Sequence, residues 1–171
     1  MGKDIYILDA STLIDIWQRF PRDLKVFQQL WEQIEELVEL EIIVVTRRNF
    51  EEVKSKSEEI HNHFKGLGIV ILTPTQEILE LAVNIQMELG ITDAEIKNNL
   101  RKGVDEGDLF CVATAKIRQA ILVTEESKQP VNSGNKGALP TNYKIPRVCA
   151  LSSVNVECIN FLELLDLIKN L

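Results

Sequence analysis

Acidic side chains stand at the ends of apolar segments in this sequence, where a carboxylate can take part in chemistry. The clearest case is Asp9, which directly follows the apolar run at 5–8. An acid in that position is unusual without a function, because a buried carboxylate must be compensated. Four acids from four separate segments have comparable positions: Asp9, Glu52, Asp108 and Glu126.

Carboxylates gathered in one place favour binding of a divalent cation. Like charges a few ångströms apart raise one another's pKa, so the group needs a compensating positive charge. Mg²⁺ and Mn²⁺ prefer hard oxygen ligands and supply that charge. Such ions can activate a water molecule and stabilise the displacement of a phosphodiester. We therefore predict that the four acids form a Mg²⁺ or Mn²⁺ site that acts on phosphodiester bonds.

The elements that must position these acids alternate along the chain. Short apolar runs, most of them near-continuous as in strands buried on both faces, lie at 5–8, 42–45, 69–72, 120–123 and 156–159. Helical patterns lie between and after them, at 23–39, 50–67, 75–89, 108–118 and 161–171. This alternation predicts a three-layer α/β/α sandwich with a central parallel sheet of about five strands. The acids would then meet at the carboxyl edge of the sheet, where such folds bind ligands.

Length and composition predict one soluble domain. With 171 residues, 45% of them hydrophobic, the chain is long enough for one core, so we expect a single domain over 1–171. The segment 127–146 holds three prolines and two glycines and predicts a long surface loop. We see neither a membrane span nor a signal peptide, and the three widely spaced cysteines fit reduced thiols, so we expect a cytoplasmic protein.

The charge balance limits the nucleic-acid surface that the protein can offer. A net charge of −7 argues against an extended electropositive surface. It does not exclude a nuclease, because carboxylates around metal ions add negative charge where cations neutralise it. The basic residues near Glu52 could contact phosphates or simply be solvated: Arg47, Arg48, Lys54 and Lys56.

Four motifs resemble those of the PIN-domain family of nucleases, over nearly the whole chain. They are YILDASTLI at 6–14, NFEEV at 49–53, DLFCVATA at 108–115 and ILVTEE at 121–126. The tail, from KIPRVCA to VECINFLELL, resembles a particular branch of PIN-like proteins. The resemblance implies a PIN-like fold in which Asp9, Glu52, Asp108 and Glu126 hold the metal, with Ser11 and Thr124 as polar supports.

The same resemblance implies an endoribonuclease that cleaves single-stranded or structured RNA. It also implies the toxin half of a toxin–antitoxin pair, with an antitoxin protein as partner. The alternative is a catalytically silent PIN-like module that binds protein or RNA. A receiver-type or phosphatase pocket is disfavoured, because no well-placed lysine follows the last strands.

Several assignments stay open at this point. Glu51 competes with Glu52, and Glu125 with Glu126, although the wider family usually has Asp at the last position. Asp105, one turn before Asp108, could be a further ligand but is better explained as a supporting or solvated residue.

The aromatic and histidine residues have simpler explanations. We expect His61 and His63 to be surface residues of a polar helix. Four aromatic side chains, spaced three, seven and four residues apart, suggest one helical face that packs in the core or at a homodimer interface: Trp17, Phe20, Phe27 and Trp31.

Overall fold

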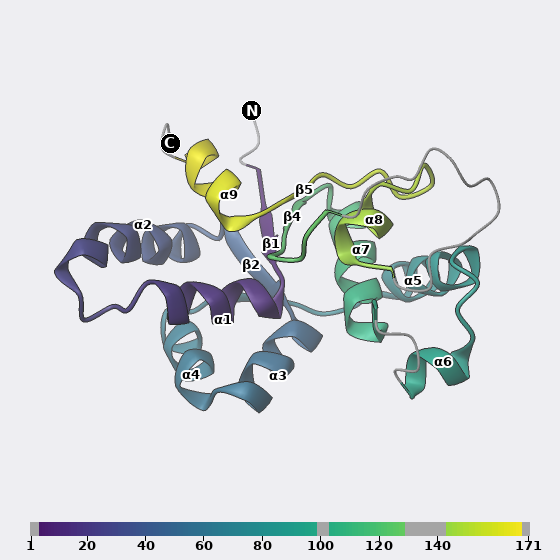
Figure 1. Ribbon diagram of the computed structural model, residues 1–171, viewed down its shortest axis with the longest axis horizontal. Coiled ribbons are helices and arrows are strands. Elements are labelled where there is room, and N and C mark those ends of the chain that lie inside the picture. Colours follow the sequence, from purple (N-terminus) through teal and green to yellow (C-terminus); the bar gives the residue numbers. More distant parts are fainter. Residues whose placement is uncertain (1–3, 99–102, 129–142, 169–171) are drawn as a thin grey trace.

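One sheet of five parallel strands lies at the centre of a computed structural model, which describes residues 4–98, 103–128 and 143–168 (Figure 1). The strands are β1 (Tyr6–Leu8), β2 (Ile43–Thr46), β3 (Val70–Leu72), β4 (Ile121–Val123) and β5 (Cys158–Ile159). Their order is β3-β2-β1-β4-β5 and every pair is parallel. The predicted sheet is confirmed, although β5 is shorter than the apolar run at 156–159.

Helices cover both faces of this sheet. They are α1 (Ala10–Arg19), α2 (Gln28–Glu39), α3 (Arg47–Lys56), α4 (Glu58–Gly66), α5 (Gln76–Glu88), α6 (Asp93–Lys97), α7 (Glu106–Arg118), α8 (Ile145–Cys149) and α9 (Phe161–Ile168). Core residues of α1, α2, α3, α4 and α9 form one apolar cluster with the sheet, and those of α5, α7 and α8 form the other. Within the described ranges, each helix is too short or too polar to cross a bilayer.

Successive residues of a strand belong alternately to the two apolar clusters. Tyr6 and Leu8 of β1 belong to the first apolar cluster, whereas Ile7 belongs to the second. Side chains along a strand point alternately to opposite faces, so a strand that is covered on both sides must be apolar throughout. This is why the runs in the sequence are near-continuous, and it confirms the three-layer α/β/α architecture.

Two of the predicted helical patterns are broken or begin irregularly in the structure. The helical pattern at 50–67 is two helices, because Ser57 has an extended backbone (φ −157°, ψ 109°) and its hydroxyl accepts the Ile60 N–H at 3.4 Å. Val53 precedes this break and Ile60 and Phe64 follow it, but all three belong to the same apolar cluster. Their spacing in the sequence therefore gives no sign of the break. The pattern at 23–39 begins as a 3₁₀ turn at Lys25–Phe27, and α2 follows it.

The predicted loop at 127–146 lies mostly outside the described residues, since 129–142 are not among them. The described chain resumes at Tyr143, and α8 begins at Ile145 with Pro146 in its first turn. Pro146 therefore belongs to a helix rather than to a loop, since proline is well tolerated in the first turn.

The strand order places a ligand-binding point beside β1. β2 and β3 lie on one side of β1 in the sheet, and β4 and β5 lie on its other side. Open α/β sheets bind ligands beyond the carboxyl ends of the strands at such a reversal. Asp9 follows β1 and Thr124 follows β4, so both lie at this point.

Candidate metal-binding site

Asp9 is a buried carboxylate that also begins α1. It is the N-cap of that helix, and its Oδ1 accepts the Ala10 N–H at 2.8 Å. Its Oδ2 accepts the hydroxyls of Ser11 (2.6 Å) and Thr124 (3.2 Å), so the two predicted polar supports do contact it. Only 5% of the residue is exposed, and it has no cationic partner among these contacts. Two hydroxyls and an amide therefore orient an acid that has no cation in direct contact with it.

Asp108 lies in the first turn of α7 and is held there by Asp105. The Asp108 N–H donates to Asp105 Oδ1 at 2.9 Å, and the Asp105 N–H donates to Asp108 Oδ2 at 2.8 Å. This capping box explains why α7 begins at Glu106, two residues before the predicted start. It also gives Asp105 a role in the structure, namely to hold the Asp108 carboxylate in one orientation.

Glu52 faces the site from α3, whereas its neighbour Glu51 is exposed. The charge of Glu52 acts on Asp9, and its carboxylate forms an ion pair with Lys56 one turn later. Glu51 and Glu52 both line a cavity of about 390 Å³ between α3 and the start of α7, so the cavity does not distinguish them, whereas burial and the charge that acts on Asp9 do. These positions favour Glu52 over Glu51 as the acid of the site.

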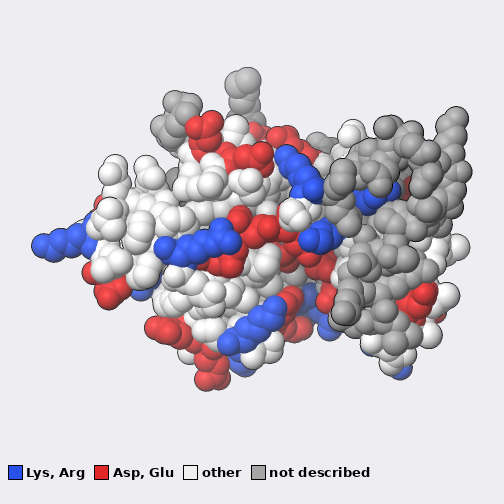
Figure 2. Space-filling view, viewed as in Figure 1, with Lys and Arg blue, Asp and Glu red and all other residues white. Residues whose placement is uncertain are grey.

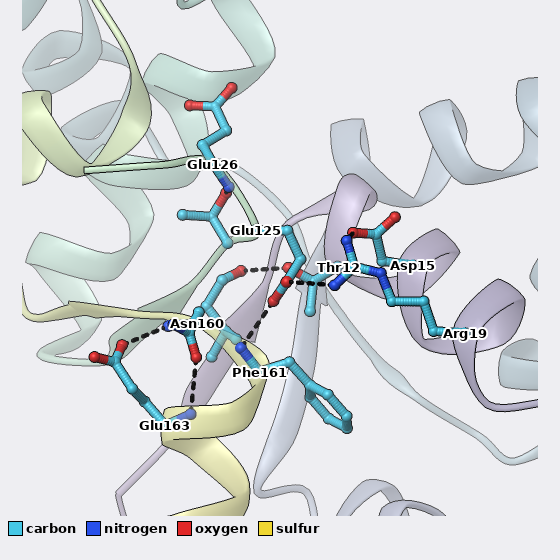
Figure 3. A network of polar contacts seen from close by, with 10 residues as sticks. Thr12, Asp15, Arg19, Glu125, Glu126, Asn160, Phe161 and Glu163 are labelled. Atoms are coloured by element: carbon cyan, nitrogen blue, oxygen red, sulfur yellow. Dashed lines mark hydrogen bonds and ion pairs between the residues drawn. The ribbon is translucent and has the colours of Figure 1, made fainter. Parts of the chain in front are cut away.

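Glu125 and Glu126 each bind the first backbone N–H of a helix. Glu125 accepts the Phe161 N–H of α9 at 2.8 Å and pairs with Arg19 at 3.4 Å (Figure 3). The Glu126 carboxylate points away from that network in the figure and accepts the Ile145 N–H of α8 at 2.7 Å. Glu125 is thus committed to α1 and α9. Glu126 holds α8 with one carboxylate oxygen, while its charge acts on Asp9 and Asp108.

The charges of neighbouring acids oppose the ionisation of Asp9 and Asp108. Burial raises the pKa of Asp9 to about 6, and the charges of Glu126 and Glu52 act in the same direction, while the Ser11 hydrogen bond opposes them. Burial, followed by the charge of Asp105, raises the pKa of Asp108 to about 8, and Asp9 and Glu126 contribute to this rise. Figure 2 shows acidic side chains gathered in the middle of this face, with basic side chains beside them. The site is therefore short of positive charge.

The donor set fits a hard divalent cation in its chemistry. All four side chains offer carboxylate oxygens, which are the ligands that Mg²⁺ and Mn²⁺ prefer. Within the described part of the chain, no three Asp, Glu, His or Cys side chains already converge as a metal-coordinating group. Binding would therefore require the acids to move closer together, and Glu52 and Glu126 each have a second carboxylate oxygen besides the one that contacts Lys56 or Ile145.

Asn49 is a buried residue of α3 close to these acids, and none of the sequence motifs indicated a role for it. Asn49 is 1% exposed, and its Nδ2 donates to the Cys111 thiol at 3.2 Å. It precedes Glu52 by one turn on α3, and Cys111 follows Asp108 by one turn on α7. The contact thus joins the two helices directly below their acids. A usable signal was Thr46, whose hydroxyl accepts the Asn49 N–H and marks the start of α3 before Asn49.

Asn49→Leu is expected to weaken Mn²⁺ binding about tenfold, the loss typical of residues that orient metal ligands. The change keeps the side-chain volume and removes the hydrogen bond to Cys111, which should lower the free energy of unfolding by about 1 kcal/mol. Calorimetric Mn²⁺ titration and urea unfolding measure the two effects. Asn62→Leu, at an exposed position on α4, is the matched control. Unchanged Mn²⁺ affinity with reduced stability would limit Asn49 to a packing role.

His63 packs with Trp17 and Trp31 in a cluster separate from the acids. The prediction that His63 is a surface residue is wrong: its ring centroid lies 5.2 Å from that of Trp17 and 5.7 Å from that of Trp31. Burial lowers its pKa. The predicted single aromatic face is also wrong, because Trp17 belongs to α1 and Trp31 to α2, although the two rings pack at 5.6 Å. These residues hold the helices together, away from the acids.

The parallel five-stranded sheet with helices on both faces is the three-layer α/β/α fold that the sequence motifs implied. The family model described as a domain of unknown function (DUF4411) matches residues 6–169. The chain belongs to this family, whose description names no activity. No curated protein matches the chain in sequence.

Two solved structures are similar in fold. The structure of VapBC2 from Rickettsia felis, bound to a DNA fragment from their promoter, has a TM-score of 0.50 at 16% identity and covers 82% of this chain and 96% of that one. The crystal structure of PAE2754 from Pyrobaculum aerophilum has a TM-score of 0.46 at 13% identity, covering 72% of this chain and 81% of that one. At such low identity, the first of these supports the PIN-like fold alone.

Proposed function

We propose that this protein is a metal-dependent nuclease whose Asp9, Glu52, Asp108 and Glu126 bind Mg²⁺ or Mn²⁺. The observation that carries the proposal is the pair Asp9 and Asp108. They come from different segments, Asp9 directly after β1 and Asp108 in the first turn of α7, and the charge of Asp9 contributes to the raised pKa of Asp108. Such an arrangement destabilises the fold unless a cation compensates it.

Each residue of the site would have its own role in hydrolysis. Asp9 and Asp108 are fixed by hydrogen bonds and would hold the cation, with Glu52 and Glu126 completing its shell. Ser11 and Thr124 would keep Asp9 in place, and Asp105 would do the same for Asp108. When bound, a divalent cation lowers the pKa of water and neutralises charge on the phosphate that is attacked.

The substrate class in this proposal is RNA, with cleavage inside the chain. This part rests on the resemblance of the four motifs to PIN-domain nucleases. The same resemblance supports a toxin that is paired with an antitoxin. The structurally similar VapBC2 was solved bound to a promoter DNA fragment. For this chain we propose RNA as the substrate and a protein antitoxin as the partner.

Cleavage assays on the full chain test the proposal. We expect the protein to degrade a mixed-sequence RNA in the presence of Mn²⁺, and to leave single-stranded DNA largely uncut. Asp108→Asn should lower the rate by at least about 100-fold, since it removes a direct ligand. Asp23→Asn, an exposed acid remote from the site, has the same charge change and should cleave like the wild type. Mn²⁺ binding without cleavage of any substrate would favour the silent binding module instead.

A further inference from the structure

A lysine already contacts the acidic site. Lys56 is the last residue of α3, and its ammonium pairs with the Glu52 carboxylate. The hydrogen bond that Lys56 donates to the Glu52 carboxylate raises the pKa of Lys56, and the charges of Glu52, Asp9 and Asp105 contribute to the rise. The ammonium therefore lies within electrostatic reach of acids from three separate segments. Its side chain is 54% exposed, so it remains free to move.

We propose that Lys56 competes with the divalent cation for Glu52 and, once displaced, binds a phosphate oxygen of the substrate. This inference rests on the proposed function, because it takes the acidic site to bind a cation. It adds a residue to that site and assigns it two successive contacts. Neither contact requires a change in the charge of Lys56.

Competition follows from the geometry of the Glu52 contact. The Glu52 oxygen that accepts the Lys56 ammonium has fewer lone pairs left for a metal ion, and the ammonium neutralises part of the charge that would attract one. An ammonium held beside a divalent ion would also repel it, and this repulsion is strong at short range. Exposed ion pairs of this kind are weak, so Lys56 can be displaced readily. Removal of the lysine charge should therefore tighten metal binding.

The displaced ammonium would stay at the rim of the site. Lys56 ends α3, its ammonium contacts Glu52 and its side chain is largely exposed, so the ammonium can reach solvent beside the acids. A lysine ammonium is a mobile point charge with three donors and is well suited to a phosphate oxygen. Removal of Lys56 should thus weaken substrate binding while it tightens metal binding. A merely structural ion pair would not give these opposite effects.

Lys54 provides a matched control for the metal measurement. It is exposed and lies two residues earlier on the same helix. Two helical steps turn a side chain about 200° around the axis, so Lys54 faces away from the direction of Lys56. Lys54→Met and Lys56→Met change the net charge equally.

The experiment measures Mn²⁺ affinity by calorimetry on the full chain, at about 0.1 M salt, where screening beyond about 10 Å is strong. We expect Lys56→Met to bind Mn²⁺ about fivefold more tightly, and Lys54→Met to change the affinity less than about twofold, because only the first removes a charge at contact distance. In a Glu52→Gln background, Lys56→Met should no longer tighten binding. At saturating Mn²⁺, Lys56→Met should raise the KM for an RNA oligonucleotide about tenfold.

The outcomes separate this inference from the proposed function. Equal Mn²⁺ affinities for Lys56→Met and Lys54→Met would overturn the competition, and an unchanged KM would overturn the phosphate contact. Persistence of the Lys56→Met effect in the Glu52→Gln background would show that Glu52 is not the shared carboxylate. A wild-type protein that binds no Mn²⁺ would overturn the proposed function itself.

Discussion

Asp9→Asn is expected to reduce Mn²⁺ affinity by at least about 100-fold and to abolish RNA cleavage, because it removes a direct ligand rather than a supporting residue. The variant should still fold. Asparagine keeps a side-chain oxygen for the Ala10 N–H, and its amide can donate to the hydroxyls of Ser11 and Thr124. Both are normally good N-cap residues, so α1 should begin at the same place.

The same variant should be more stable than the wild type when no divalent cation is added. Burial raises the pKa of Asp9 from 3.8 to about 6. Ionised Asp9 therefore destabilises the fold above pH 6 by up to about 3 kcal/mol, and the neutral amide removes this effect. Urea unfolding at pH 8 in EDTA measures the difference, with Asp23→Asn as the control. If Asp9→Asn were less stable and still bound Mn²⁺ normally, Asp9 would be a helix cap and not a ligand.

The free energy of unfolding should fall as the pH rises from about 4 to about 8 in EDTA. Asp9 and Asp108 have pKa values of about 6 and about 8 in the folded protein, against 3.8 for the free side chain. Between these values the folded state binds more protons than the unfolded state, so stability is lost as the pH rises. We expect a loss of about 3 kcal/mol from Asp9. Asp108 is half-buried, and solvent screening should reduce its share.

A double variant isolates these two groups from the other acids of the chain. Asp9→Asn combined with Asp108→Asn should show a shallower dependence on pH, since neither position can titrate. Mn²⁺ at about 100 times its Kd should stabilise the wild type at pH 8 by about 2.7 kcal/mol and leave the double variant unchanged. Equal pH profiles for the two proteins would mean that these carboxylates are already compensated in the fold.

The features that could be predicted from sequence were local ones. A strand buried on both faces must be apolar along its length, so β1, β2 and β4 stand out as near-continuous runs, and the edge strand β3 is also apolar although its Ile71 is exposed. The residue after such a strand lies at the carboxyl edge, which is why Asp9 could be placed without a structure. The alternation of strands and helices then restricts the fold to a parallel sheet.

The features that escaped prediction depend on partners far along the chain. Asn49 and Cys111 are 62 residues apart, and nothing in either helix pattern indicates that they meet. Periodicity shows which face of a helix is buried but not what covers it. The polar pattern of the helix therefore predicts, wrongly, that His63 is a surface residue. The contact of Glu126 with Ile145 also joins two segments, and it decides where that carboxylate points.

The hydrogen bond between Thr124 and Asp9 has a consequence for the time at which the acidic site can form. The two residues are 115 positions apart, and β1 pairs with β4 only after the intervening chain has been made. Contacts of such long sequence separation form late in folding. During synthesis, a ribosome-bound chain that ends before Thr124 has Asp9 but cannot orient it. A nuclease with this layout would stay inactive toward the messenger and ribosome that produce it until the chain has been made past Thr124.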